Sequence, residues 1–185
     1  MNPSQIQIFG LAQRFALNLR INAPVVLFKE RHHGLKYQSI TNRIIVGGDF
    51  YSRSQEAREV AVAQAIGLAA QREDFFRFMR PFWAGSLWSV ALIVAGFVAG
   101  KFFDSWTVQL TMQVVGVGMF VVAQRRLKKG YPKFQVKRAT YADKVAAQIC
   151  GPTAVLSAIE STQAKPMSDL DATRIEKLRD FATVA

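Results

Sequence analysis

The sequence predicts an α+β protein that is mainly helical and carries a two-span transmembrane helical hairpin. The main observation is a pair of 20-residue stretches without any charge, 81–100 and 105–124, each long enough to cross a hydrocarbon core as a helix. Before them lie short runs rich in β-branched residues, which are typical of strands. Apolar residues at helical spacing fill most of the remaining chain. We therefore expect the spans to be attached to a small cytoplasmic domain that contains a β-hairpin.

Composition excludes several classes of protein. Half of the 185 residues are apolar, which excludes a disordered chain. The single cysteine, Cys150, excludes a scaffold held by disulfides, and the two histidines, His32 and His33, are too few for a typical metal cluster. With 24 Lys and Arg against 13 Asp and Glu, the net charge is +11. The chain is therefore either a soluble basic protein or a small membrane protein with basic flanks.

The start of the chain is expected to form a helix and a β-hairpin. Apolar spacing predicts an amphipathic helix over 4–19, which Pro24 stops. The runs 25–28 and 35–46 are interpreted as strands that pair around a turn at 32–34.

A second helix is expected to follow. Ser52, with Gln55 three residues later, matches a capping box, and the helix should run from there to about residue 74. One of its faces is small and largely apolar, which would let a neighbouring helix approach closely. This face comprises Ala57, Val60, Ala61, Gln64, Ala65 and Leu68.

The two uncharged stretches are expected to form a helical hairpin with a tight turn at 101–104. Trp83 lies near the start of the first stretch, as interfacial aromatic residues often do. The second stretch contains Gln109 and Gln113, whose amides favour a face packed on protein rather than on lipid.

Charge predicts the orientation of these spans. Residues 1–80 carry eleven Lys and Arg and six acidic residues, residues 125–185 carry twelve and six, and the turn carries one of each. By the positive-inside rule, both termini lie in the cytoplasm, in a bacterial-type inner membrane or its equivalent, and the turn lies on the other side. The alternative is a pair of helices buried in a soluble core.

A basic connector is expected directly after the spans. Its leading cations are Arg125, Arg126, Lys128 and Lys129. Gly130 and Pro132 are expected to break the chain's helical path here. Because the cations abut a span, we expect them to contact anionic lipid headgroups. The simpler interpretation is that these cations only set the orientation of the spans. Binding to nucleic acid ranks third, because the chain's aromatic residues are not interleaved with the basic ones as stacking platforms.

Three helices are expected to complete the cytoplasmic domain. The first covers about 141–149, and Pro152 opens the second as its first residue. The third has an apolar stripe of Ile175, Leu178 and Phe181. The domain would thus be built from both ends of the chain, 1–80 and 125–185.

Two segments on either side of the spans resemble a known family. Residues 60–74 read VAVAQAIGLAAQRED, similar to the pattern AVLAHELGHIxNRD, and residues 139–160 read ATYADKVAAQICGPTAVLSAIE, similar to ExxADxxAAxLtGPxALisAIE. With the order of the elements, they resemble the HtpX-like and CAAX-prenyl-protease membrane zinc metallopeptidases. The resemblance implies a zincin-like fold in which the two segments share one site.

The metal ligands of that family are missing here. Gln64 stands where the first His belongs, Ala65 replaces the Glu, Leu68 replaces the second His, and Ala139 stands where the third ligand belongs, whereas Asp143 is retained. Zinc chemistry of this kind needs two His, a Glu base and a third carboxylate. The resemblance therefore implies a degenerate pseudopeptidase without catalytic residues, metal or cofactor.

A pseudopeptidase of this kind is expected to be a structural or accessory subunit of a larger membrane assembly, such as a membrane-containing particle. Its partners would be membrane lipid and other protein subunits, with no small-molecule substrate. One competing hypothesis is an enzyme with a rebuilt, non-zinc site around Gln64, Asp143, Cys150 and the two histidines. Cys150 precedes a helix start, where thiolates can be activated, although a small buried residue is the simpler interpretation.

Overall fold

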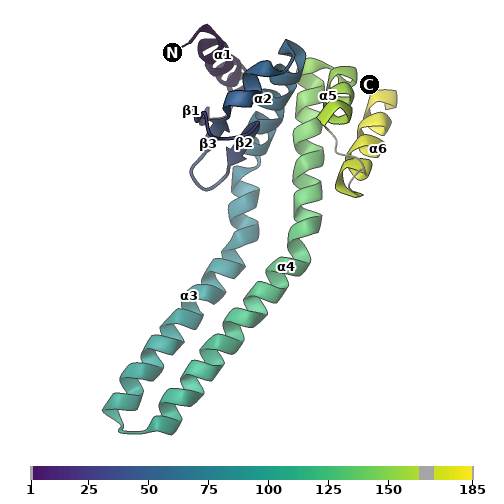
Figure 1. The fold of residues 1–185 in the computed structure, drawn as a ribbon. Helices are drawn as coiled ribbons and strands as arrows, with labels where there is room; N and C mark the ends of the chain where they lie inside the picture. The colour runs from purple at the N-terminus through teal and green to yellow at the C-terminus, as the bar shows by residue number, and fades with distance from the viewer. Residues whose placement is uncertain (1, 163–168, 185) are drawn as a thin grey trace. The chain divides into compact units, whose positions relative to one another are not determined.

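The computed structural model describes residues 2–162 and 169–184 (Figure 1). The chain divides into two compact units. Met1–Glu73 and Gln135–Ala185 form one unit, here called the head, and Asp74–Phe134 form the other, here called the helical hairpin. The elements are α1 (Pro3–Asn18), β1 (Val25–Phe28), β2 (Leu35–Gln38), β3 (Arg43–Val46), the 3₁₀ helix η1 (Gly48–Ser52), α2 (Gln55–Ala70), α3 (Arg72–Phe102), α4 (Trp106–Cys150), α5 (Pro152–Thr162) and α6 (Asp169–Val184).

The head contains a three-stranded mixed sheet, not the expected pair of strands. Its order is β1-β3-β2, with β1 parallel and β2 antiparallel to β3. The run 25–28 does pair with the end of the run 35–46, but in parallel. The expected hairpin between the two runs was wrong because the second run turns back on itself. Asn42 adopts a positive φ of 50°, and the Tyr37 hydroxyl donates to Asn42 Oδ1 at 2.9 Å. The β-hairpin is therefore β2-β3, and β1 pairs with the other edge of β3.

The second helix of the head begins later than expected. Residues Gly48–Ser52 form η1, and the fully buried Phe50 anchors this turn in the core. The predicted capping box at Ser52 was wrong: Ser54 is the N-cap, and its hydroxyl accepts from the Ala57 amide at 3.3 Å. α2 ends at Ala70, and residues 72–74 already belong to α3, so the single helix expected up to residue 74 is divided between two helices.

A single apolar core joins both ends of the chain in the head. α1, α2, β3 and the last turns of α4 meet α5 and α6 in it, and Ile175 and Leu178 of the predicted α6 stripe are buried there, with Phe181 packed against it. A fully buried side chain of this size contributes about 1.5–3 kcal/mol. The largest members of the core are Phe15, Phe50, Ile8, Ile44, Ile66 and Leu178.

α4 runs without a break through the expected connector. Gly130 and Pro132 both lie inside the helix, so the predicted break was wrong. Proline removes one backbone hydrogen bond, but long apolar helices tolerate it when neighbours support the segment. Support comes from α3, where the ring of Phe78 stacks on Phe134 at 4.1 Å and 5°.

Small residues hold α3 and α4 together within the helical hairpin. Ser89 is buried, and its hydroxyl donates to the Gly116 carbonyl at 2.6 Å. A side chain at Gly100 would lie 2.5 Å from Cβ of Gln109, so only glycine fits. Gln109 thus packs on α3 of its own hairpin, in agreement with the expectation that its amide lies on a face packed on protein.

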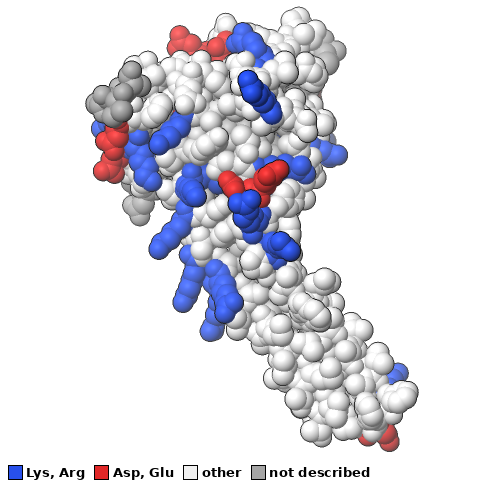
Figure 2. Space-filling model, turned by 180° about the vertical axis from the view of Figure 1, so that it is seen from behind, with Lys and Arg blue, Asp and Glu red and all other residues white. Residues whose placement is uncertain are grey.

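Both hairpin helices are long and apolar enough to cross a membrane. Of their most apolar 18-residue stretches, only 11% in α3 and 6% in α4 is buried within the chain, so these helices are not core helices of this chain. The turn covers 103–105 rather than the expected 101–104, and Asp104 has a positive φ of 45°. On the face in Figure 2, the hairpin surface is mostly uncharged between its tip and a group of Lys and Arg side chains.

Candidate functional site

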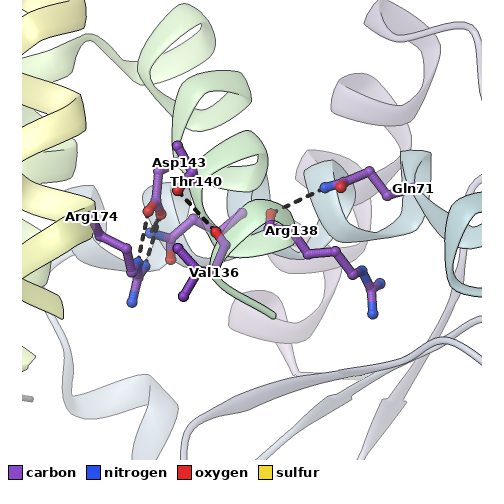
Figure 3. Close-up of polar contacts among 7 residues, drawn as sticks. Gln71, Val136, Arg138, Thr140, Asp143 and Arg174 are labelled. Carbon is purple, nitrogen blue, oxygen red and sulfur yellow. Dashed lines mark hydrogen bonds and ion pairs between the residues drawn. The ribbon is translucent and has the colours of Figure 1, made fainter. Parts of the chain in front are cut away.

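A buried polar cluster joins three helices of the head. Asp143 of α4 is fully buried. It accepts from Arg174 of α6 at both oxygens, with Nε to Oδ2 at 2.7 Å and Nη2 to Oδ1 at 2.8 Å (Figure 3). Gln64 of α2 adds a third bond, from Nε2 to Oδ1 at 2.8 Å. The cluster thus links residues that lie far apart in the sequence.

The negative charge of Asp143 is compensated within the cluster. The side chain of Asp143 is 1% exposed and that of Arg174 is 19% exposed. Burying a carboxylate is costly unless a cation and hydrogen bonds compensate, and a bidentate guanidinium is the strongest such partner. Because an ionised carboxylate only accepts, the NH₂ of Gln64 must face it, which leaves the Gln64 carbonyl oxygen directed elsewhere.

Close contact between α2 and α4 brings this cluster together. A Cβ at Gly67 would lie 2.8 Å from Cα of Ala142, so the two backbones touch. Gln71 Nε2 donates to the Arg138 carbonyl at 3.1 Å in the same region (Figure 3). The close approach therefore occurs at Gly67, not on the small face of α2 that the sequence had indicated.

That small face lines a cavity instead. The cavity has a volume of about 480 Å³ and lies within the head; it is here called the head cavity. Its α2 wall consists of Ala57, Val60, Ala61, Gln64, Ala65 and Leu68. Residues 33–35 and Tyr37 form a second wall, and Arg53, Ala158, Ile159 and Arg174 complete the lining. Such a volume suits a small ligand or a few side chains of a partner.

The charge of the head cavity is positive. Arg53 and Arg174 both line it, and no Asp or Glu is among its described lining residues. Tyr37 also lines it, and burial raises the pKa of this phenol, partly offset by the nearby charges of Arg72 and Arg138. The phenol therefore remains protonated at neutral pH.

A loop contact fixes the rim of the head cavity. The Gly34 amide donates to Asp49 Oδ1 at 2.6 Å, and this bond holds the pKa of the Asp49 carboxyl below its ordinary value. The exposed His33 ring lies 3.6 Å from the other carboxylate oxygen. A side chain at Gly47 would clash with the His32 carbonyl, so the Gly47–Asp49 turn has a structural role.

The structure brings together most of the predicted site residues. Gln64, Ala65 and Leu68 line the head cavity, and Asp143 bonds Gln64. Ala139 lies one helical turn before Asp143 on α4, and it is not among the described residues that line the cavity.

These residues do not fit a zinc ion. Ala65, Leu68 and Ala139 carry no donor atom, and the nitrogen of Gln64 is committed to Asp143. Both oxygens of Asp143 are engaged by a guanidinium, whose positive charge opposes a second cation. Among the described residues, no group of three or more His, Cys, Asp or Glu is placed to hold a metal.

Of the remaining candidates, His33 lines the same head cavity as Gln64 and Arg174. His32 and His33 are exposed. Cys150 is the last residue of α4 and packs against the core. Burial raises the pKa of its thiol, with a further increase from Glu59, so it is not an activated thiolate.

Sequence reasoning missed Arg174 and the cavity residues of the loops. A signal for Arg174 existed, because it lies four residues before Leu178 and seven before Phe181. That spacing places a charge on the apolar face of α6. For Arg53 and Tyr37 no comparable signal was present, since their positions depend on the path of the sheet.

The predicted lipid-contacting cations lie in the helical hairpin. Arg125, Arg126, Lys128 and Lys129 are all exposed on α4. They project from one continuous helix, not from a separate connector.

Comparison of the chain with protein-family models, with curated proteins and with solved structures gave no match.

Proposed function

We propose that the chain is a non-catalytic membrane protein, a degenerate relative of the HtpX-like and CAAX-prenyl-protease zinc metallopeptidases that acts as a structural or accessory subunit of a membrane assembly. The ion pair between Arg174 and Asp143 carries this proposal. Where a peptidase would hold a dication, this chain has a half-buried guanidinium bonded to a buried carboxylate and two apolar side chains, Ala65 and Leu68. Such a site suits binding, not water activation.

Membrane anchoring belongs to the same proposal. α3 and α4 would cross the bilayer, with both termini in the cytoplasm and only the turn beyond the far surface. Support comes from the low burial of both apolar helices and from the excess of Lys and Arg at the two ends of the chain.

Restoring the lost ligands tests the relationship. The variant combines Gln64→His, Leu68→His and Ala139→Glu. Gln64 and Leu68 lie one turn apart on α2 and line the same cavity, and Ala139 is one turn from the residue that bonds Gln64. We expect about one zinc per chain by elemental analysis of this variant, and none in the wild-type protein.

A variant with only Gln64→His and Ala139→Glu is the matched control and should retain little zinc. If the triple variant keeps the wild-type circular dichroism spectrum but binds no zinc, even when Arg174→Gln is added to remove the opposing positive charge, the proposed family relationship is wrong. If the wild-type protein carries one zinc and hydrolyses peptides, the non-catalytic assignment is wrong.

Labelling of single cysteines tests the topology. In a Cys150→Ser background, Lys36→Cys and Lys177→Cys report on the head, and Phe103→Cys reports on the turn; all three positions are exposed. In sealed membranes, residue 103 should react with an impermeant maleimide from the side opposite to the other two. Labelling of all three from one side contradicts a spanning hairpin.

The accessory role is tested by the state of the chain in mild detergent. We expect it to leave its native membrane in a complex of fixed stoichiometry, measured by light scattering. Recovery of the whole population as a free monomer contradicts this role.

A further inference from the structure

A groove runs between the two helices of the helical hairpin. It is lined only by α3 and α4, has a volume of about 720 Å³ and is mostly apolar; it is here called the interhelical groove. From Arg77 to Gly85 on α3 it extends along nine residues, about 12 Å of helix. This length accommodates a large part of one acyl chain.

Glycines and aromatic rings shape the interhelical groove. At Gly85 the helices touch, because an added Cβ would lie 3.2 Å from Cβ of Ala123. At Gly118 they leave space, because an added Cβ there would meet no atom within 4 Å. Near the other end, the stacked rings of Phe78 and Phe134 join α3 to α4. The groove is therefore bounded along its length.

The charged residues that line the groove are both cations. Arg77 and Arg126 contribute one from each helix. The carboxylate of Asp74 lies 3.8 Å from Arg77, but both side chains are largely exposed, so this pair competes weakly with another anion. Arg125, Lys128 and Lys129 follow on the same stretch of α4, and Figure 2 shows Lys and Arg side chains gathered at this end of the hairpin.

An apolar slot with two arginines at one end matches one class of ligand. We propose that the interhelical groove binds one anionic phospholipid, with an acyl chain between α3 and α4 and its phosphate between Arg77 and Arg126. This inference rests on the proposal that the two helices span a membrane. An apolar helix of a partner protein would match the apolar wall, but it would bring no anion to the two guanidinium groups.

Native mass spectrometry of the full chain in detergent tests the site. The protein is titrated with phosphatidylglycerol or with phosphatidylcholine of the same acyl chains. We expect one phosphatidylglycerol to be retained in preference to phosphatidylcholine. The double variant Arg77→Gln/Arg126→Gln should lose about 25-fold in this preference, about fivefold for each arginine.

Two matched controls separate a built site from general attraction. Arg125→Gln/Lys129→Gln removes the same charge outside the groove and should keep the preference. Gly118→Leu fills the groove and should abolish retention of both lipids, whereas Val117→Leu, at a 53% exposed position outside the groove lining, should not.

Three outcomes overturn the proposal: equal retention of the two lipids, an equal loss in the Arg125/Lys129 control, or retention of lipid by Gly118→Leu. A partner helix in the groove would appear as loss of a protein subunit, not of lipid, in Gly118→Leu. Failure here is distinguishable from failure of the membrane proposal. If the Phe103→Cys variant is labelled from the far side of the membrane but the protein shows no lipid preference, only the proposed lipid site is wrong.

Discussion

The head and the helical hairpin bury opposite kinds of side chain. The head encloses large apolar residues such as Phe50 and Ile66, and with them the carboxylate of Asp143. The hairpin buries Ser89 and three glycines, while its large apolar residues, such as Leu87, stay exposed. The contrast teaches that two different forces act in one chain: water drives the packing of the head, whereas close backbone contact drives that of the hairpin.

The largest effect is expected at the buried ion pair of the head. Arg174→Ala leaves Asp143 buried without its cation, which should cost about 3–5 kcal/mol of unfolding free energy. Urea unfolding of the full chain in detergent, followed by hydrogen exchange of α2 amides, measures the loss.

Replacing both partners is the control. Asp143→Leu/Arg174→Met should restore most of the lost stability, because a well-packed apolar pair can replace a buried ion pair. A loss below about 1 kcal/mol in Arg174→Ala would show that the pair is not closed off from water as the structure indicates.

Truncating large apolar residues tests the contrast directly. Ile66→Ala in the head should cost about 2–5 kcal/mol, since Ile66 is fully buried. Leu87→Ala in the hairpin, where the side chain is 72% exposed, should change the stability of the hairpin by less than about 1 kcal/mol. Hydrogen exchange reports on the head, and fluorescence of Trp83, Trp88 and Trp106 reports on the hairpin. Similar losses of stability in the head and in the hairpin would contradict the difference in packing between them.

Enlarging a small residue should destabilise the hairpin, because small residues form the contact between its two helices. Gly100→Val forces a side chain into Gln109 and should destabilise the hairpin by about 1–3 kcal/mol, read from the tryptophan fluorescence during denaturation with SDS. Gly118→Ala is its matched control, because its new methyl group meets open space and alanine favours the helix. If the two variants behave alike, contact at Gly100 does not hold the hairpin together.

The smallest effect is expected at the rim of the head cavity. The Gly34 amide lowers the pKa of Asp49, so this carboxylate stabilises the loop above the ordinary pKa of an Asp, and the stabilisation disappears as the pH falls through the lowered value. The NMR shift of the Gly34 amide should follow this titration, with a midpoint below the ordinary pKa of an Asp. In Asp49→Asn the shift of the Gly34 amide should not change with pH. A titration that persists in this variant would show that another group causes it.

Local patterns predicted the elements better than their connections. The helix at the start of the chain, the strand positions and the apolar stripe of α6 followed from spacing and agree with the structure. The β-hairpin was misplaced because the turn at Asn42 interrupts one apolar run. The break at Gly130 and Pro132 was wrong because the stack of Phe78 on Phe134 supports the helix across that segment, and no local rule contains such a contact.

The candidate site was predicted in part. The resemblance named Gln64 and Asp143, which share a hydrogen bond. The resemblance did not predict a role for Arg174, because this residue lies outside the two matching segments. Arg174 reaches the site only through the packing of α6. The resemblance therefore indicated that Gln64 and Asp143 lie close together, but the ion pair between Arg174 and Asp143 depends on a tertiary contact.

The discontinuous head also constrains how the protein is made. Gln64 and its partner Asp143 are 79 residues apart, and a ribosome that adds about 5–20 residues each second needs about 4–16 s to make that interval. During this delay α2 has been synthesised, but α5 and α6, which share its apolar core, have not. The nascent chain must therefore keep an apolar helix from aggregating, through a chaperone or the membrane surface, until its last third emerges.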